Sequence, residues 1–353
     1  MQTRTSGEPS GKMEILGIKF APLNVPFRRR METLAALSWI CTPTFVPLIS
    51  LYIFCYVLLF TKYYWLPLLY LIFLYLDFDQ PHQGGRSIEL VRNVPWWKLL
   101  TDYFPLTLVK TCELPPDRNY LFCFYPHGVL SLNATAHFTT NGTNFKKQFP
   151  GLKRYLATLD AHFRTPLIRD ILLGLGLVSS SKRSLLNVLG SEEKGRAIAL
   201  MLGGAQEALY AKPGSYKTVL KKRKGFIKIA LRTGASLVPV YAFGENDLYD
   251  QLSNPPGSFL FKVQEFVKKV TGFAPVIPLG RGVFQYSFGL IPQRRPIHTV
   301  VGKPIHLKKT DDFSEEMVES IHKNFTEELI ALFEEHKHKY IENADDIHLE
   351  ITE

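Results

Sequence analysis

The segment Tyr120-Leu121-Phe122-Cys123-Phe124-Tyr125-Pro126-His127-Gly128 decides how the rest of the chain is interpreted. Its first five residues form a short, aromatic run bounded by Asn119 and Pro126, which predicts a buried strand. A histidine follows, held between a proline that fixes the backbone and a glycine that leaves room for a ligand and exposes a backbone N–H. Because imidazole titrates near neutral pH, His127 is a candidate general base. The alternative is a histidine that merely caps a strand end.

The composition indicates a folded protein with an anionic partner. The chain has 353 residues, of which 46% are hydrophobic and 13% aromatic, and its formal net charge is +10. This length allows one large domain or two modest ones with a sizeable core. The excess of positive charge favours a membrane surface, a phosphorylated ligand or nucleic acid. The four cysteines form no C-x-x-C pair, so they predict neither a disulfide framework nor a zinc site.

The longest apolar stretch, Leu34 to Leu76, carries Lys62 as its only formal charge. It has almost no polar positions at helical spacing, so we predict that it is embedded in a membrane. Its second arm, Tyr63 to Leu76, would be about 21 Å long as a helix, short of the roughly 30 Å hydrocarbon core. A hairpin, or a spanning helix with a re-entrant partner, therefore fits better than two upright helices. The basic residues Arg28 to Arg30 place the flanking side in the cytoplasm.

These features divide the chain into five segments. We predict a polar, basic cytosolic tail over 1–31, the membrane hairpin over 32–76, an interfacial connector over 77–118, the main α/β domain over 119–340 and a loose acidic tail over 341–353. The connector mixes aromatic and basic residues, which suits either the lipid headgroup layer or ordinary packing against the domain.

From Asn119 onward, strand patterns alternate with helix patterns, which predicts a mixed or parallel sheet covered by helices on both faces. Strands are predicted over Tyr120–Phe124, Ala197–Leu202, Leu237–Phe243 and Thr299–Val301. Helices are predicted over Gly225–Arg232, closed by Gly234, and from about Ser314 to Lys339, where Asp312 and Glu315 can form a capping box.

Two further motifs follow predicted strands. In Gly203-Gly204-Ala205-Gln206-Glu207 the glycines let the backbone approach a ligand, and Glu207 could orient an imidazole; the alternative is a glycine-rich turn with a solvated glutamate. In Phe243-Gly244-Glu245-Asn246 a strand ends in a turn with polar side chains, where α/β folds commonly build sites.

A basic run extends from Lys217 to Arg232, with no acidic residue between Ser215 and Gly234. It can bind the phosphates of a nucleotide-like ligand, or lipid headgroups, or be solvated surface. The apolar stretch argues against nucleic acid as the partner. The sequence contains no metal-ligand cluster, phosphate-binding loop, nucleophile elbow or dinucleotide fingerprint.

Taken together, these motifs resemble the type-2 diacylglycerol acyltransferase family, which also holds monoacylglycerol and wax-alcohol acyltransferases. The resemblance rests, in order, on Arg118 through Gly128, Phe149-Pro150-Gly151, Gly203 through Leu209, Arg223-Lys224-Gly225-Phe226, Leu237 through Val240 with Phe243 through Asn246, and Val301 through Ile305. The segment Phe73-Leu74-Tyr75-Leu76 is similar to a neutral-lipid-binding pattern proposed in the family.

Two positions depart from the family pattern. The family often has a second histidine two places before His127, where this chain has Tyr125. Related glycerolipid acyltransferases place an aspartate five residues after their histidine, where this chain has Leu132. A carboxylate that orients the imidazole must therefore come from elsewhere, with Glu207 as the first candidate and Asp160 as the second.

The resemblance implies a glycerolipid-acyltransferase-like fold and an enzyme of the endoplasmic reticulum membrane and lipid-droplet surface, with its active domain in the cytosol. It would transfer a fatty acyl group from acyl-CoA to the free hydroxyl of diacylglycerol. The alternatives are a monoacylglycerol or long-chain alcohol acceptor, or a non-catalytic lipid-droplet protein that binds lipid. A homo-oligomer is compatible with the sequence.

The resemblance also implies roles for individual residues. His127 and Glu207 are expected to be catalytic, with backbone N–H groups near Gly128 or the Gly203-Gly204 turn stabilising an oxyanion. The expected substrate-binding residues are Tyr125, Pro126, Gly128, Gly203, Gly204, Arg223, Lys224, Gly225, Phe226, Glu245 and Asn246, and the expected neutral-lipid residues are Phe73, Leu74 and Leu76. Acyl-CoA is a co-substrate, and no cofactor or metal is expected.

Overall fold

The computed structural model describes residues 13–22, 24–251, 257–271 and 278–353. Its centre is a seven-stranded sheet in the order β3-β12-β9-β4-β7-β5-β6. Neighbouring strands are parallel except β12 and β9, which are antiparallel. The predicted mixed α/β sheet is therefore confirmed. The strands are β3 (Leu106–Lys110), β4 (Tyr120–Tyr125), β5 (Lys153–Thr158), β6 (Leu177–Ser179), β7 (Arg196–Met201), β9 (Ser236–Phe243) and β12 (Ile297–Val301).

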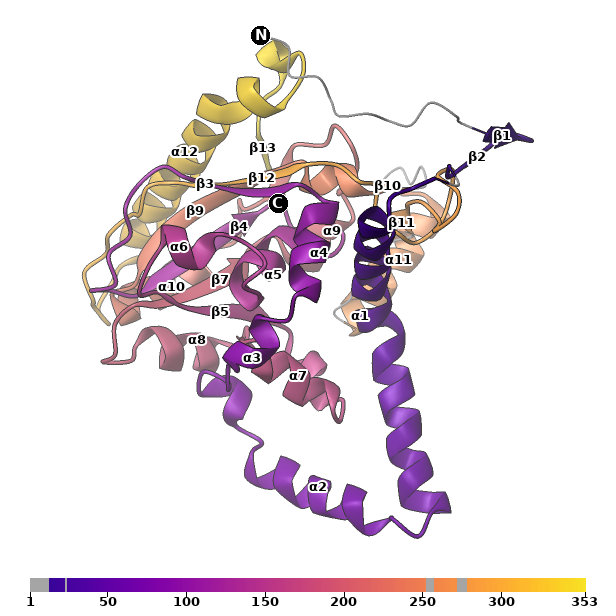
Figure 1. The fold of residues 1–353 in the computed structure, drawn as a ribbon. Helices are drawn as coiled ribbons and strands as arrows, with labels where there is room; N and C mark the ends of the chain where they lie inside the picture. Colours follow the sequence, from indigo (N-terminus) through magenta and orange to yellow (C-terminus); the bar gives the residue numbers. More distant parts are fainter. Residues whose placement is uncertain (1–12, 23, 252–256, 272–277) are drawn as a thin grey trace.

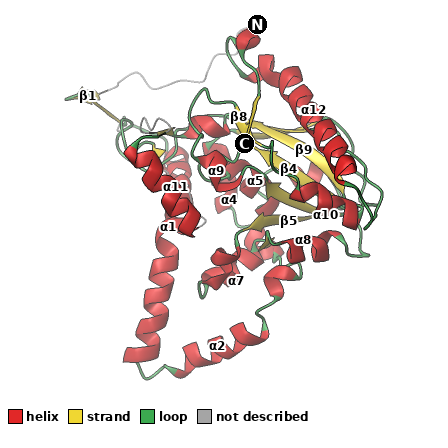
Figure 2. Cartoon of the chain, turned by 180° about the vertical axis from the view of Figure 1, so that it is seen from behind, coloured by secondary structure: helices red, strands yellow, loops and turns green. Residues whose placement is uncertain are grey.

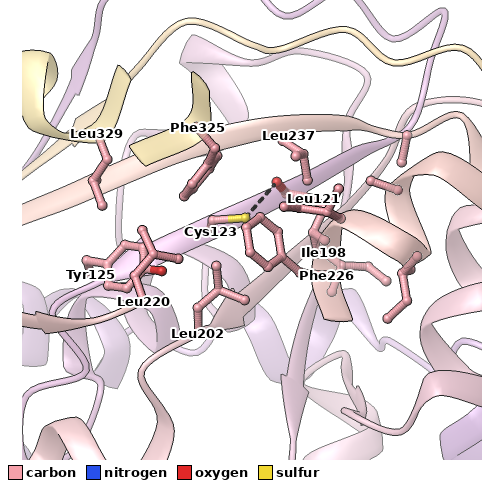
Figure 3. Close-up of a cluster of buried hydrophobic side chains, with 14 of the residues drawn as sticks. Leu121, Cys123, Tyr125, Ile198, Leu202, Leu220, Phe226, Leu237, Phe325 and Leu329 are labelled. Atoms are coloured by element: carbon pink, nitrogen blue, oxygen red, sulfur yellow. Dashed lines mark hydrogen bonds between the residues drawn. The ribbon is translucent and has the colours of Figure 1, made fainter. Parts of the chain in front are cut away.

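Strand β4 lies inside the sheet, and its side chains alternate between two apolar cores. Leu121, Cys123 and Tyr125 belong to one core, which includes residues of α10 (Gly225–Thr233) and α12 (Glu315–Tyr340) (Figure 3). Tyr120, Phe122 and Phe124 belong to the other core, together with residues of α5 (Leu132–Thr139). Both faces are covered, so β4 is apolar throughout rather than alternating.

The four predicted strands correspond to β4, β7, β9 and β12, with ends that differ by at most two residues. Both predicted helices are also present, as α10 and α12, and Gly234 follows the end of α10. The predicted capping box is wrong. Ser314 occupies the N-cap position, and its hydroxyl accepts a hydrogen bond from the N–H of Met317 at 3.1 Å, the usual geometry of a serine cap.

Further helices surround the sheet, and short strands lie outside it (Figures 1 and 2). The helices are α3 (Glu89–Arg92), α4 (Trp96–Tyr103), α6 (Phe145–Gln148), α7 (Ile168–Gly174), α8 (Lys182–Leu189), α9 (Gly204–Ala208) and α11 (Phe259–Thr271), with 3-10 turns η1 (Gln80–His82), η2 (Asp160–Arg164), η3 (Glu245–Leu248) and η4 (Ala344–Asp346). The short strands are β1 (Met13–Ile15), β2 (Ile18–Phe20), β8 (Lys217–Val219), β10 (Asp250–Gln251), β11 (Pro278–Leu279) and β13 (Glu350–Thr352).

The prediction of a loose acidic tail is wrong, because β13 pairs in parallel with β8. Each register position joins residues far apart in sequence, such as Glu350 and Lys217, whose side chains form an ion pair at 2.9 Å. Opposite charges and backbone pairing together hold the end of the chain against the basic run.

The predicted membrane segment forms two helices, α1 (Phe27–Phe60) and α2 (Trp65–Leu76), which extend away from the sheet (Figures 1 and 2). Within the described residues, no single helix is long and apolar enough to cross a membrane. The two halves of α1, Phe27–Pro43 and Phe45–Phe60, together have sufficient length and apolar composition, but they are bent by 59° relative to each other. The bend lies beside Pro43, as expected for a proline inside a helix. Many large apolar side chains of both helices are exposed.

Polar contacts attach both ends of this segment to the domain. The indole N–H of Trp96 in α4 donates to the hydroxyl of Ser38 in α1 at 2.8 Å. After α2, the carboxylate of Asp77 accepts from Arg86 at 2.8 Å and from the buried Arg169 at 2.6 Å. The part of the connector that carries Trp96 thus packs against α1, which favours the packing interpretation over the headgroup one.

Candidate active site

The turn after β4 holds His127 in one tautomer. Its ring Nδ1 lies 3.0 Å from the carbonyl oxygen of Gly128. A carbonyl only accepts, so Nδ1 carries the proton and Nε2 keeps its lone pair as an acceptor. The side chain is half-buried, and burial lowers the pKa of His127 below its usual 6.5, although the Gly128 carbonyl partly opposes this shift. The imidazole is therefore neutral near pH 7 and can accept a proton at Nε2.

Ser131 is a neighbour of the imidazole that the sequence analysis missed. Its hydroxyl donates to the carbonyl oxygen of His127 at 3.1 Å and lies 3.3 Å from each ring nitrogen. Ser131 directly precedes α5 and has a φ of +52°. A serine four residues after the histidine, at the start of a helix, is the signal that could have identified it.

Glu207 lies beside His127 as predicted, but it binds the main chain and not the imidazole. One carboxylate oxygen accepts from the backbone N–H of His127 at 2.6 Å, and the other accepts from the backbone N–H of Val219 in β8 at 3.0 Å. The side chain is almost completely buried, and burial raises the pKa of Glu207 to about 8 despite these two donors. Glu207 is thus a positioning residue that joins the His127 turn to β8.

The expectation that a carboxylate orients the imidazole is not met by either candidate. Glu207 contacts the backbone, and Asp160 is an exposed residue of η2 that forms no hydrogen bond with His127. The carbonyl of Gly128 takes the orienting position instead. A main-chain acceptor fixes the tautomer without burying another charge beside the ring.

A second buried carboxylate, that of Glu245, stabilises the start of α5. Its two oxygens accept from the backbone N–H groups of Leu132 at 2.9 Å and Asn133 at 3.1 Å. These N–H groups belong to the first turn of a helix, which has no internal acceptors for them. Burial raises the pKa of Glu245 to about 7. Glu245 was predicted to bind substrate, and the structure shows it holding the helix that follows His127.

Each of these two buried carboxylates occupies space beside a glycine of the predicted motifs, where a side chain on the glycine would overlap it. A Cβ on Gly203 would lie 2.3 Å from the carboxyl carbon of Glu207. A Cβ on Gly128 would lie 2.6 Å from Cγ of Glu245, and Gly128 also has a φ of +62°. By contrast, a Cβ on Gly204 would meet nothing within 4 Å. The first two glycines therefore make room for the protein's own carboxylates.

Several predicted substrate-binding residues occupy other positions. Tyr125 and Phe226 are buried in the apolar core, where the Tyr125 hydroxyl has no hydrogen-bond partner among the described residues (Figure 3). Pro126 is buried after a cis peptide bond. The amide of Asn246 donates to the carbonyl oxygen of Ser215 at 2.8 Å. Gly225 opens α10 and is exposed.

The predicted neutral-lipid residues lie in α2, where Phe73 and Leu76 are exposed and Leu74 is half-buried. They lie on a helix that extends away from the sheet (Figure 1). The structure therefore places them apart from the His127 turn, on the same apolar helix that the sequence predicted.

The basic run is largely neutralised by acidic residues from the C-terminal part of the chain. Ion pairs join Lys217 to Glu350, Lys222 to Glu353, Lys224 to Glu319 and Lys228 to Glu315. Arg223 is different: its guanidinium is exposed and forms no ion pair with another described residue. It is close enough to Glu207 to favour the ionised carboxylate. Of the two predicted phosphate-binding residues, Lys224 is thus paired with Glu319, whereas Arg223 forms no ion pair within the described part of the chain.

Among the described residues, no group of three or more histidine, cysteine, aspartate or glutamate side chains could hold a metal ion. The His127 turn offers a neutral imidazole with an acceptor at Nε2, and the N–H of Gly128, which has no acceptor within the described part of the chain.

Comparisons with known proteins agree on one family. A family model described as diacylglycerol acyltransferase matches residues 56–352. 2-acylglycerol O-acyltransferase 1 of Bos taurus is 48% identical over 92% of this chain and 96% of its own length. Diacylglycerol O-acyltransferase 2 of Dictyostelium discoideum is 44% identical over 91% of this chain and 96% of its own.

A solved structure of the 1-acyl-sn-glycerophosphate acyltransferase PlsC from Thermotoga maritima covers 86% of this chain and 100% of its own, at 14% identity and a TM-score of 0.37. The family model and the two sequence relatives each span most of the chain. The chain belongs to the diacylglycerol acyltransferase family and is an acyltransferase.

Proposed function

We propose that this protein transfers a fatty acyl group from acyl-CoA to the free hydroxyl of diacylglycerol, with His127 as the general base. The observation that carries the proposal is the hydrogen bond from Nδ1 of His127 to the Gly128 carbonyl, which leaves Nε2 as an acceptor on a neutral ring. A base in this form can take the proton of an alcohol near neutral pH.

The reaction uses one proton, which His127 first takes and then returns. Nε2 removes the proton from the lipid hydroxyl as its oxygen attacks the thioester carbonyl. The N–H of Gly128 stabilises the resulting oxyanion. Collapse of the tetrahedral intermediate forms the ester and breaks the C–S bond. Thiols ionise at about pH 8.5, so the CoA thiolate leaves without a strong acid and takes the proton from the imidazolium.

The two substrates reach the site by different routes in this proposal. The exposed apolar surfaces of α1 and α2 insert into the lipid layer as a hairpin and deliver the acceptor, with Phe73, Leu74 and Leu76 among the lipid contacts. The domain faces the cytosol at the endoplasmic reticulum or lipid-droplet surface, where Arg223 binds a CoA phosphate. Family membership also supports a glycerolipid-acyltransferase-like fold for the domain.

Monoacylglycerol is the second candidate acceptor, because the relative that is 48% identical is named a 2-acylglycerol O-acyltransferase. Microsomes containing the protein should be assayed with labelled oleoyl-CoA against diacylglycerol, 2-monoacylglycerol and a long-chain alcohol. A preference for diacylglycerol supports the proposal, and a preference for 2-monoacylglycerol moves it to the second candidate. Incorporation into no acceptor would favour a lipid-binding protein without activity.

His127→Ala should abolish transfer while membrane association stays intact. The matched control is His306→Ala, since His306 bonds Ser236 at the beginning of β9, at the opposite end of the strands from His127. In the wild type, kcat/KM should rise with pH through the pKa of His127, because only the neutral ring accepts a proton; burial lowers that pKa, so the acid limb lies below pH 6.5. Near-normal activity of His127→Ala would remove His127 from the mechanism.

A further inference from the structure

A cavity of about 370 Å³ lies between α3, α6 and β5, away from the His127 turn. Of its nine lining residues, four are basic and one is acidic. The basic ones are Arg92, Lys146, Lys153 and Arg154, and the acidic one is Glu89. Arg154 pairs with Ala197, which in turn pairs with Tyr120. The cavity is thus level with the beginning of β4, whereas His127 follows its end.

The floor of the cavity is formed by two buried arginines that line it and form no ion pair with a described residue. Arg92 and Arg154 are 3% and 4% exposed, and neither forms an ion pair with a described residue. Their hydrogen bonds go to neutral acceptors in the last turn of α5 and just beyond it. Arg92 donates to the carbonyl of Phe138, and Arg154 donates to the carbonyls of His137 at 2.6 Å and Thr140 at 2.8 Å and to the side-chain amide oxygen of Asn141. Nε of Arg92 is buried and has no acceptor in the part of the chain that the structure describes.

The positive charges of the Arg92 and Arg154 guanidinium groups are only partly compensated by negative charge. Burial, with repulsion from Arg92, lowers the pKa of Arg154 to about 9, although the negative charge of Glu89 partly opposes this shift. Buried charges in proteins are normally paired, and removing two from water without a counter-charge is costly. The carbonyl oxygens of α5 supply partial negative charge only. An anion in the cavity would therefore supply what the floor lacks.

The rim of the cavity, formed by Lys146 and Lys153, adds exposed positive charge. Lys146 and Lys153 are exposed, and their partners Glu89 and Glu193 are exposed too. The Lys146–Glu89 separation is 3.4 Å, a surface pair that contributes little to stability and can rearrange for a stronger ligand. Guanidinium groups bind phosphate through two parallel N–H···O bonds, and lysines bind it as point charges.

We propose that this cavity binds a phosphate group, at a site separate from the thioester chemistry at His127. Three sources share that chemistry: free phosphate, the phosphates of CoA and the headgroup of an anionic phospholipid. The basic floor recognises the phosphate oxygens, and the exposed rim leaves the rest of a larger ligand outside the protein.

The test measures the binding of inorganic phosphate to the full chain in detergent. The unfolding temperature is followed against phosphate concentration, with chloride holding ionic strength constant. Lys146→Glu reverses one rim charge at an exposed position and should weaken phosphate binding by about tenfold or more. Lys147→Glu is the matched control, because Lys147 is the next residue of α6, is also exposed and does not line the cavity. Glu89→Gln should tighten binding, since it removes the acidic lining residue.

Saturable stabilisation by phosphate, lost in Lys146→Glu and kept in Lys147→Glu, supports the proposal. No saturable stabilisation, or equal losses in the two lysine variants, would overturn it. Repeating the titration with coenzyme A and with micelles containing phosphatidic acid identifies the source: the ligand whose binding exceeds that of free phosphate, and which Lys146→Glu weakens, is the occupant. If neither exceeds free phosphate, the occupant is free phosphate.

Discussion

Gly203→Ala tests whether the glycine motif serves a ligand or the protein's own carboxylate. The backbone of Gly203 has an ordinary right-handed conformation, with φ −65° and ψ −31°, so alanine adds no backbone strain there. Its methyl group would instead lie 2.3 Å from the carboxyl carbon and from Oε2 of Glu207. This overlap forces the carboxylate away from the backbone N–H groups of His127 and Val219.

The size of the effect follows from those two hydrogen bonds. Losing both leaves two backbone N–H donors without their acceptor, and each unsatisfied donor costs about 1–3 kcal/mol, so the free energy of unfolding should fall by about 2–6 kcal/mol. Gly204→Ala is the matched control, because its methyl group meets nothing within 4 Å and only its φ of +59° is unfavourable. Placing a non-glycine residue there costs about 1–2 kcal/mol.

Urea denaturation and acyl transfer should be measured on both variants. We expect Gly203→Ala to be strongly destabilised and inactive, and Gly204→Ala to be mildly destabilised with most of its activity. If Gly204→Ala were instead inactive and Gly203→Ala active, the glycine motif would serve a ligand and not the carboxylate of Glu207. A ligand that approaches the open side of Gly204 would be excluded by the methyl group there. A stable, active Gly203→Ala would show that the carboxylate does not hold the His127 turn.

Three further outcomes can be measured. Tyr125→Phe should leave kcat and KM unchanged and raise the free energy of unfolding by up to about 1–3 kcal/mol, because it removes a buried hydroxyl with no partner; a rise in KM would instead show that Tyr125 binds substrate. Burial raises the pKa of Glu207 from 4.5 to about 8, so on raising the pH the unfolded chain loses this proton before the folded chain does. The free energy of unfolding of the wild type should therefore fall as the pH rises from about 5 to 8. Chemical denaturation across that range should show a smaller fall in Glu207→Gln, and equal slopes would contradict the raised pKa. Arg223→Glu should raise the KM for acyl-CoA more than Lys224→Glu does, because Lys224 is already paired with Glu319; equal effects on detergent-dispersed substrate would argue against a specific role for Arg223.

The parts of the fold that the sequence predicted are those with local signals. Strand β4 is an uninterrupted apolar run, and α12 repeats apolar residues on one face. Strand β5 was missed, because it begins Lys153-Arg154 and a buried arginine resembles a surface residue in sequence. Its burial depends on carbonyl groups of α5, which only the folded chain brings there.

For the candidate site, the sequence predicted which residues are neighbours but not which of their atoms are in contact. His127 and Glu207 were correctly brought together, since both motifs follow parallel strands that are neighbours in the sheet. The atoms that meet could not be predicted, because a glutamate can bind a backbone N–H or an imidazole with the same sequence pattern. The ion pairs that partly neutralise the basic run could not be predicted for another reason. Their acidic residues lie between 87 and 133 positions further along the chain.

The pairing of β8 with β13 also sets when the site can be completed during synthesis. Val219 of β8 binds Glu207, but the only strand paired with β8 among the described residues contains Glu350, which lies 133 positions after Lys217. At about 5–20 residues per second, a ribosome needs roughly 7–27 s to cover that interval. Helices α1 and α2 precede His127 in the chain, so they leave the ribosome earlier still. We therefore expect a nascent chain to meet lipid well before it has a finished catalytic turn.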